Sequence, residues 1–365
     1  MRTLYQKIKR IYKTHEREFS AFALVLGFVI DNLTLQRIDL AFENFVLFFY
    51  MTLIAVAILL LQKESSQPKK TITVRAIEWA TLFAPFIMQY ALGGLFSGLS
   101  IFYFRSATLA ASWPFLFILV VVLIGNEVYA KKLHKNIVLQ LSVFYFSLFS
   151  FSIFFVPIIV KDISVWVFIL SGAFSLLVIF GFIFILKKYS NEEKVITSYK
   201  KITLAIGAVY IGINTLYFLN VIPPIPLSMK ERQLGYSVQR IANNYEISVA
   251  DTNWLQNFGI IQNFQKEAGK PVYFFTSVFA PTKFQKTIIH QWQTKRNDKW
   301  VTVSEIPFSI SGGRDGGYRG YSYSNKVTGG TWRVQTVLDN GQIIGRKTFT
   351  VEIVNKVIQK KKELF

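Results

Sequence analysis

The sequence contains no cysteine and only three histidines in 365 residues. The lack of cysteine excludes disulfide bonds, thiolate metal sites and a thiol nucleophile. His15 and His134 are expected in the cytoplasm and His290 in a strand beyond the membrane, so the three cannot share a metal ion. Metalloprotease, nucleophile-elbow and phosphate-loop motifs are also missing. The sequence therefore predicts no enzyme and no cofactor.

Apolar residues are abundant instead: 52% of the chain is hydrophobic and 35 residues are phenylalanine. The chain is organised around the apolar run 202–221, which follows a cationic loop and precedes Ile-Pro-Pro-Ile-Pro. About 20 apolar residues can cross a bilayer as a helix, and the prolines cannot continue one. Hydropathy predicts seven spans in all, at residues 19–36, 41–61, 79–103, 109–124, 137–160, 165–186 and 202–221.

The first of these segments has two interpretations. A signal peptide would also begin with basic residues and continue into a short apolar core. No small-x-small cleavage site follows it, however, which favours an uncleaved first span. Both interpretations leave the orientation of the downstream spans unchanged.

Basic residues alternate between the two ends of the predicted spans. Eighteen of the 41 lie before the first span or in the second, fourth and sixth connections. The other connections carry only Arg37, Arg105 and Lys161. Because positive charge stays in the cytoplasm, the pattern predicts a protein of the cytoplasmic (inner) membrane with a cytoplasmic N-terminus and an extracytoplasmic C-terminal domain.

The predicted fold class is multi-domain, with an all-α polytopic membrane bundle followed by a small, mainly-β soluble domain of the immunoglobulin-like sandwich type. The expected parts are a basic cytoplasmic N-terminus (1–18), the bundle (19–221), a linker with short strands and one amphipathic helix (222–270), an extracytoplasmic β-sandwich (271–354) and a basic tail (355–365). The tail is interpreted as a solvated end.

Period-two alternation bounded by turn residues predicts the strands of the sandwich. They are expected at 272–280, 286–294, 300–310, 318–327, 331–338 and 342–353. Asp339-Asn340-Gly341 predicts a tight hairpin of the primed type. In the linker, strands are expected at 234–241 and 245–249. The amphipathic helix that follows them would carry on one face Trp254, Phe258, Ile261 and Phe264.

The third span carries the polar candidates of the membrane part. Gly94 and Gly98 are four residues apart, so one helix face is small enough for another helix to approach closely. Helix packing is the favoured interpretation. The alternative is that Gln89 and the glycine face line a polar path for a substrate. Glu78 and Arg105 lie at the ends of the span, where water can reach them, so the sequence does not indicate a proton or ion relay.

The better binding candidates lie in one predicted strand, where Arg319, Tyr321 and Tyr323 alternate onto the same face. If the tyrosines face solvent, they would suit stacking against a sugar or peptide, with Arg319 supplying charge. Burial in the core is the favoured interpretation, because large aromatic side chains are usually mostly buried.

Two further candidates lie near this strand. The glycine-rich segment 311–320 could form an anion nest with Arg314 and Arg319, although a long hairpin loop is favoured. His290 shares a strand face with Trp292. The default interpretation of that pair is a structural tryptophan beside a hydrogen-bonded histidine.

A series of short motifs in the last part of the chain carries a family resemblance. They are His290-Gln-Trp292, Arg319-Gly-Tyr-Ser322, Gly330-Thr-Trp-Arg-Val334, Asp339-Asn-Gly341, Ile344-Gly345 and Phe349. This pattern resembles the bacterial family known as domain of unknown function 2914. The resemblance implies an uncharacterised bacterial envelope protein, and no catalytic residue comes with it. The Gly-Thr-Trp-Arg-Val run is expected to be an inner strand with Trp332 and Val334 inward and Arg333 outward.

Charge suggests the class of partner. After residue 226 there are twenty basic and ten acidic residues, a surplus that would attract an anionic surface. We therefore expect a lipid bilayer around the spans, an anionic envelope polymer, glycan or another envelope protein as the partner of the sandwich, and no nucleic acid. The alternatives are a small-solute transporter or channel that uses the third span, and a membrane enzyme acting on lipid-linked sugars.

Overall fold

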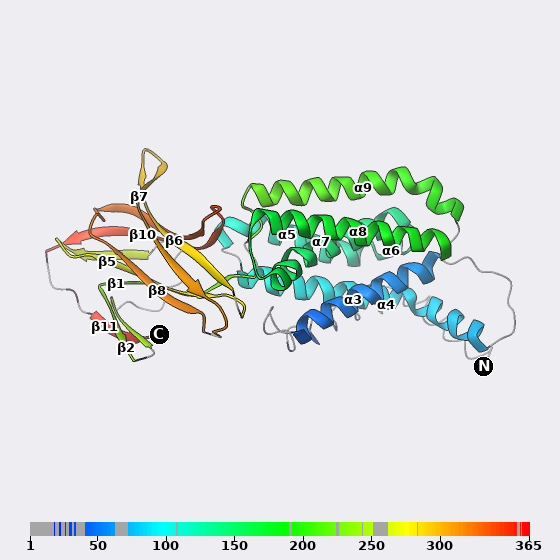
Figure 1. The fold of residues 1–365 in the computed structure, drawn as a ribbon, viewed down its shortest axis with the longest axis horizontal. Helices are drawn as coiled ribbons and strands as arrows, with labels where there is room; N and C mark the ends of the chain where they lie inside the picture. Colours follow the sequence, from blue (N-terminus) through cyan, green and yellow to red (C-terminus); the bar gives the residue numbers. More distant parts are fainter. Residues whose placement is uncertain are drawn as a thin grey trace. The chain divides into compact units, whose positions relative to one another are not determined.

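The computed structural model describes residues 41–62, 72–106, 109–189, 192–223, 226–242, 244–250, 262–282, 284–314, 316–355, 358 and 360–365, together with single residues 18, 22, 26, 29, 30 and 33. The chain divides into two compact units (Figure 1). The helical unit comprises Met1–Phe104 and Trp113–Ile222, and the β unit comprises Arg105–Ser112 and Pro223–Phe365.

The described residues include seven helices. They are α3 (Ala41–Gln62), α4 (Ile72–Ser106), α5 (Leu109–Val128), α6 (Ala130–Lys135), α7 (Ile137–Val160), α8 (Val165–Tyr189) and α9 (Glu192–Phe218). Five contain a segment long and apolar enough to cross a membrane, and these are α3, α4, α7, α8 and α9. The apolar part of α5, Ser112–Asn126, is shorter, and the expected first span lies outside the described residues except for five single positions.

Helix α7 is the centre of the helical unit, because it contacts α3, α6, α8 and α9. Asn136 caps its start by accepting hydrogen bonds from the backbone N–H groups of Val138 and Leu139, and Lys161 ends it in the left-handed conformation. Along its length, the ring of Phe149 stacks on that of Tyr210 in α9 at 5.6 Å. Ring contacts of this kind join α7 to its neighbouring helices.

The β unit contains eleven described strands. They are β1 (Ser228–Gly235), β2 (Ser237–Ile241), β3 (Asn244–Ala250), β4 (Gln262–Glu267), β5 (Val272–Phe279), β6 (Gln285–Arg296), β7 (Lys299–Ser311), β8 (Tyr318–Ser324), β9 (Gly330–Leu338), β10 (Ile343–Val354) and β11 (Lys360–Leu364). All six strands expected in the sandwich are present.

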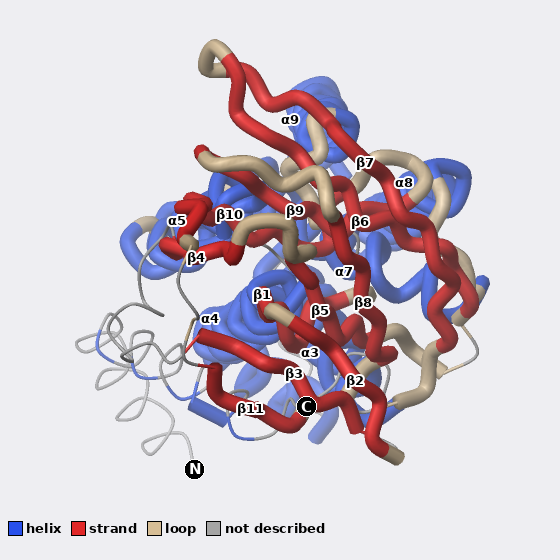
Figure 2. Tube along the Cα trace, turned by 90° about the vertical axis from the view of Figure 1, so that its left-hand side faces the viewer, coloured by secondary structure: helices blue, strands red, loops and turns tan. Residues whose placement is uncertain are grey.

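These strands form three sheets with the orders β1-β5-β8, β4-β10-β9-β6-β7 and β11-β3-β2. We call them the inner sheet, the five-stranded sheet and the outer sheet. Every pairing is antiparallel except that of β10 with β4. Figure 2 shows β11, β3 and β2 side by side.

The main core lies between the inner and five-stranded sheets. Trp292 and Trp332 fill its centre and are both fully buried, with Phe274 and Phe349 around them. Trp332 and Val334 point inward from β9 while Arg333 lies on the opposite side of the strand, as the sequence predicted. A second, smaller core forms where Phe275 of β5 packs on the outer sheet.

His290 belongs to this main core and not to a surface. Both ring nitrogens form hydrogen bonds. Nε2 lies 3.0 Å from Thr276 Oγ1, and Nδ1 lies 2.9 Å from Ser322 Oγ. Trp292 Nε1 also donates to Ser322 Oγ at 3.1 Å. As a ligand-binding residue His290 was therefore predicted wrongly, whereas the structural interpretation of the His290 and Trp292 pair is confirmed.

The hairpin turns test the turn types that short sequence motifs predict. Between β9 and β10, Gly341 has a φ of +83° and its N–H donates to the carbonyl of Leu338. The turn is therefore a type I turn followed by a left-handed glycine, and not a primed turn. The primed geometry occurs between β6 and β7, where Asn297 and Asp298 both have positive φ.

Two expected segments differ in the structure. Residues 262–267, which include the last turn of the predicted amphipathic helix, form β4 instead, because Phe264 is buried beside Phe349 in the main core. The rest of that helix lies outside the described residues. The C-terminal tail was predicted wrongly as a solvated end: Lys360–Leu364 pairs with β3, and the ring of Phe365 packs on Phe275 at 5.5 Å.

Burial of His290 predicts a specific pH dependence. Desolvation lowers the pKa of His290 from 6.5 to about 3, so below pH 6.5 the unfolded chain binds a proton that the folded chain does not. Between pH 7.5 and 5.5 this difference should lower the free energy of unfolding of the β unit by about 1.4 kcal/mol. Urea titration of the full-length protein, followed by tryptophan fluorescence, measures the change. His290→Gln should lose this component while His134→Gln keeps it, and an unchanged slope in His290→Gln would contradict the assignment.

Packing of the chain end predicts a second effect. Phe365→Ala should lower the free energy of unfolding of the β unit by about 1–2 kcal/mol, less than for a fully buried phenylalanine because the ring is only half-buried. Leu364→Ala is the matched control, since its side chain is exposed. Equal losses in the two variants, in the same urea experiment, would rule out a specific contribution of Phe365.

Candidate functional site

Strand β8 presents two of its three tyrosines, Tyr321 and Tyr323, to solvent. Tyr321 is 43% exposed and Tyr323 53% exposed, while Ser322 and Ser324 between and beside them are buried. The alternation of faces predicted from the sequence is therefore present, but the favoured placement of these tyrosines in the core is wrong. The small serines face the core because its space is taken by Phe274 of the adjacent strand β5 and by Trp292 of β6 in the facing sheet.

Pairing of the strands adds further tyrosines to this surface. Tyr323 pairs with Tyr273 of β5, and their ring centroids lie 5.4 Å apart. Tyr321 lies 6.2 Å from Tyr273 and 6.2 Å from Tyr245 of β3. We call this set the tyrosine face: Tyr245, Tyr273, Tyr321 and Tyr323. It combines three strands from two sheets.

The tyrosine face rests on a rigid support. Tyr245 and Tyr273 are half-buried and pack on the small core around Phe275. Tyr245 also exchanges two backbone hydrogen bonds of 2.9 Å with Phe365, which ties β3 to the end of the chain. The rings of Tyr245 and Tyr273 are therefore held in place by packing, while those of Tyr321 and Tyr323 are exposed to solvent. This arrangement suits contact with a flat ligand.

Charge beside the face comes from Arg319, on the same side of β8 as the tyrosines. Its Nη1 donates to Asn244 Oδ1 at the start of β3, at 3.2 Å. The exposed Arg314 guanidinium lies over the ring of Tyr318 at 5.4 Å. The anion nest of Arg314 and Arg319 stays a prediction.

Sequence reasoning missed Tyr245 and Tyr273 as members of the face. Tyr273 occupies the second position of a predicted strand, and Tyr245 the first position of another. Only the register between strands brings them together, and the residue types alone carried no signal that they would meet Tyr321.

In the helical unit, the candidates of the third span are packed. Gln89 is fully buried and donates through Nε2 to the carbonyl of Asn126 at 3.0 Å. A Cβ added at Gly94 would lie 2.5 Å from the ring of Tyr50, so the glycine admits a neighbouring helix side chain. Gly98 is buried in the same helix. Glu78 and Arg105 lie in α4, but their side chains are outside the described residues.

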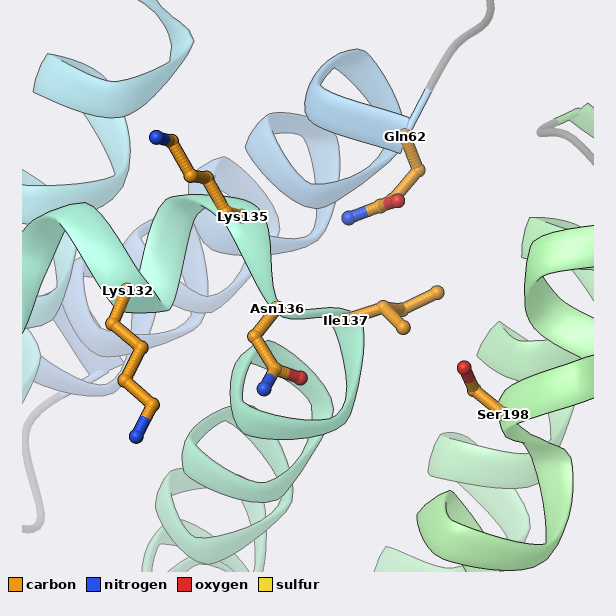
Figure 3. A pocket seen from close by; sticks show the side chains of 6 residues that line it. All are labelled: Gln62, Lys132, Lys135, Asn136, Ile137 and Ser198. Carbon is orange, nitrogen blue, oxygen red and sulfur yellow. The ribbon is translucent and has the colours of Figure 1, made fainter.

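A cavity of about 370 Å³ lies where the end of α3 meets the junction of α6 and α7, and Ser198 of α9 also lines it (Figure 3). Two exposed lysines, Lys132 and Lys135, stand at its rim and point in different directions in Figure 3. The amide of Gln62 is already engaged by Gln140 at 2.9 Å. With no convergent set of polar groups, the cavity has no evident ligand.

No group of three His, Asp or Glu residues in the described part of the chain lies close enough to bind a metal. Other solved structures give no guide to function. An alkylpurine DNA glycosylase AlkC from Pseudomonas fluorescens, bound to DNA with an abasic site analog, aligns over 79% of this chain and 84% of its own at 10% identity. Its TM-score is 0.23, too low to carry meaning. No protein with a curated description matches the chain.

The family resemblance carried by the short motifs has direct support. The segment that matches a family model, residues 285–351, begins at the start of β6 and ends within β10. It contains Tyr321 and Tyr323 but not Tyr245 or Tyr273. Residues 285–351 match the family described as "Protein of unknown function (DUF2914)", the family that the sequence motifs indicated.

Proposed function

We propose that this chain is a non-enzymatic bacterial envelope protein whose helical unit anchors it in the cytoplasmic membrane and whose β unit binds an acidic glycan through the tyrosine face. The observation that carries the proposal is the exposure of Tyr321 and Tyr323 beside Tyr273, because exposed clusters of large aromatic rings are uncommon on soluble domains without a partner.

An immunoglobulin-like arrangement of the β unit is part of this proposal. The order β1-β5-β8 facing β10-β9-β6-β7 corresponds to strands A, B and E facing G, F, C and C′ of such a sandwich. The parallel pairing of β4 with β10 and the fully buried Trp292 on the strand equivalent to C support it further. Extracellular recognition domains commonly use this architecture, although fold alone does not assign a ligand.

The chemistry of the face favours a glycan. Tyrosine offers an apolar ring for the C–H face of a sugar and a hydroxyl for its hydrogen bonds. The ring of Tyr273 lies 6.2 Å from that of Tyr321 and 5.4 Å from that of Tyr323, so successive sugars could contact successive rings. The excess of ten positive charges after residue 226, from twenty basic and ten acidic residues, would favour an acidic polymer over a neutral one.

The helical unit supports anchoring more than transport. A transport path through the third span would need solvent or substrate access to Gln89, and that side chain is fully buried against Asn126. The apolar segments of five helices are sufficient for membrane insertion by length and composition.

The proposed binding is tested with two soluble probes, alginate as the acidic polysaccharide and dextran as the neutral one. Tyr321→Ala and Tyr323→Ala should each weaken binding of alginate to the full-length detergent-solubilised protein about tenfold, which corresponds to about 1.4 kcal/mol. Isothermal titration calorimetry gives the dissociation constants. Tyr189→Ala, an exposed tyrosine of the helical unit, is the control and should bind as the wild type does.

Three results would contradict the proposal: no binding of either polymer by the wild type, equal loss in the Tyr189 control, or full binding by the Tyr321→Ala/Tyr323→Ala double variant. Binding should also weaken as salt is raised, because the charge attraction is screened.

The proposed orientation has its own test. Since basic residues crowd alternate ends of the spans, a reporter that is active only in the cytosol should remain inactive when fused after Phe365 by a flexible linker. The same reporter fused before Met1 should be active and serves as the control. Strong activity from the C-terminal fusion would place the β unit in the cytoplasm and remove an envelope glycan as its ligand.

A further inference from the structure

A second group of side chains lies on the face of the five-stranded sheet that points away from the main core. Gln293 of β6 pairs with Arg333 of β9, and Gln335 of β9 pairs with Arg346 of β10. Trp300 of β7 completes the row. We call this set the arginine face: Gln293, Trp300, Arg333, Gln335 and Arg346.

Neighbouring side chains hold Arg333 in one orientation. Its Nε–H donates to Gln293 Oε1 at 2.5 Å, and its guanidinium carbon lies 4.2 Å from the centre of the Trp300 ring. Gln293 is in turn fixed, because its Nε2 donates to Thr302 Oγ1 at 3.0 Å. A guanidinium oriented before binding loses less conformational freedom when a ligand arrives.

Arg346 is diagonal to Arg333 across the β9–β10 pairing, two residues from the direct partner of Arg333, Thr348. Side chains at such positions are close enough to share one ligand. The two glutamines between and beside them are almost fully buried, with Gln335 4% exposed and Gln293 9% exposed. The two arginines thus lie on a surface whose glutamines are covered by neighbouring side chains.

The charge of this face is uncompensated. In the part of the chain that the structure describes, neither Arg333 nor Arg346 forms an ion pair with an acidic side chain. The Nε of Arg346 is buried without a hydrogen-bond partner in the same described part. Burial, followed by repulsion from Arg346, lowers the pKa of Arg333 to about 10, and burial lowers the pKa of Arg346.

Arg346 is partly desolvated, lies beside a second cation and has an Nε without a hydrogen-bond partner in the described part of the chain, and each of these opposes folding. A purely structural position would be filled better by a neutral side chain. We propose that the arginine face binds an oxyanion, the carboxylate or phosphate group of a ligand, between Arg333 and Arg346. Guanidinium groups bind both kinds of oxyanion through paired N–H donors.

This site is independent of the glycan site. The tyrosine face belongs to the inner and outer sheets, whereas all five residues of the arginine face belong to strands of the five-stranded sheet and to the family-matched segment 285–351. The proposal therefore stands or fails separately from the proposed function.

Trp300 provides the readout. Sodium phosphate and sodium acetate, each at ionic strength matched with sodium chloride, are titrated into the full-length detergent-solubilised protein. The fluorescence of Trp300, taken as the difference between the wild type and Trp300→Phe, should change saturably with at least one of the two anions. Arg333→Gln and Arg346→Gln should each raise the apparent dissociation constant at least tenfold. Arg296→Gln, an exposed arginine at the end of β6, should leave it unchanged.

A thermal measurement separates binding from a structural role. Without added anion, Arg346→Gln should melt at the same temperature as the wild type or a few degrees above it, because repulsion and desolvation are relieved. With added anion, the wild type should gain melting temperature and Arg346→Gln should not. A phosphate preference indicates a phosphate ester and an acetate preference a carboxylate, and both support the site. No saturable response to either anion, an equal effect of Arg296→Gln, or a lower melting temperature of Arg346→Gln without anion would overturn the proposal.

Discussion

The hydrogen bonds of Ser322 across the main core are the constraint on which the β unit depends. Its hydroxyl forms hydrogen bonds with Trp292 Nε1 and His290 Nδ1, and these bonds connect β8 of the inner sheet to β6 of the five-stranded sheet. A slip of β8 by one residue would bring a tyrosine into this space and expose the serine. Because the indole N–H can only donate, the arrangement that satisfies every group has the serine donating to Nδ1 and Nε2–H donating to Thr276. The network thereby decides that Tyr321 and Tyr323 face solvent.

The two outer surfaces of this sandwich differ in chemistry because their supports differ. The inner sheet is backed by the outer sheet, whose apolar residues anchor Tyr245 and Tyr273 and leave the edge strand β8 with two free rings. The five-stranded sheet has no such covering layer among the described strands, and its central strands carry glutamines and arginines that bond to one another. An aromatic surface and a cationic surface on one small domain would suit a ligand with both sugar rings and acidic groups, or two separate ligands.

The helical unit follows a different physical rule. Its centre is an apolar helix, α7, surrounded by aromatic rings, and several of its polar side chains donate to nearby backbone carbonyls. Serines along α7 and α8 return hydrogen bonds to carbonyls of the preceding turn, as Ser152 does to Leu148 and Ser171 to Val167. Gln89 likewise finds a carbonyl of α5. Such bonding reduces the cost of these polar groups among apolar helices.

What the sequence determined by itself is local: apolar runs long enough to become helices, strands with period two, the inward Trp332 and outward Arg333 of β9, and the motifs of the matched family. Each depends on residues close together in the chain, whose periodicity reports their burial. Only the tertiary structure decided the exposure of Tyr321 and Tyr323, the burial of His290, the conversion of residues 262–267 into a strand and the pairing of the chain end with β3. These depend on partners from distant segments, because a strand face is wet or dry only according to which sheet lies over it, and that information is not present in the strand's own residues.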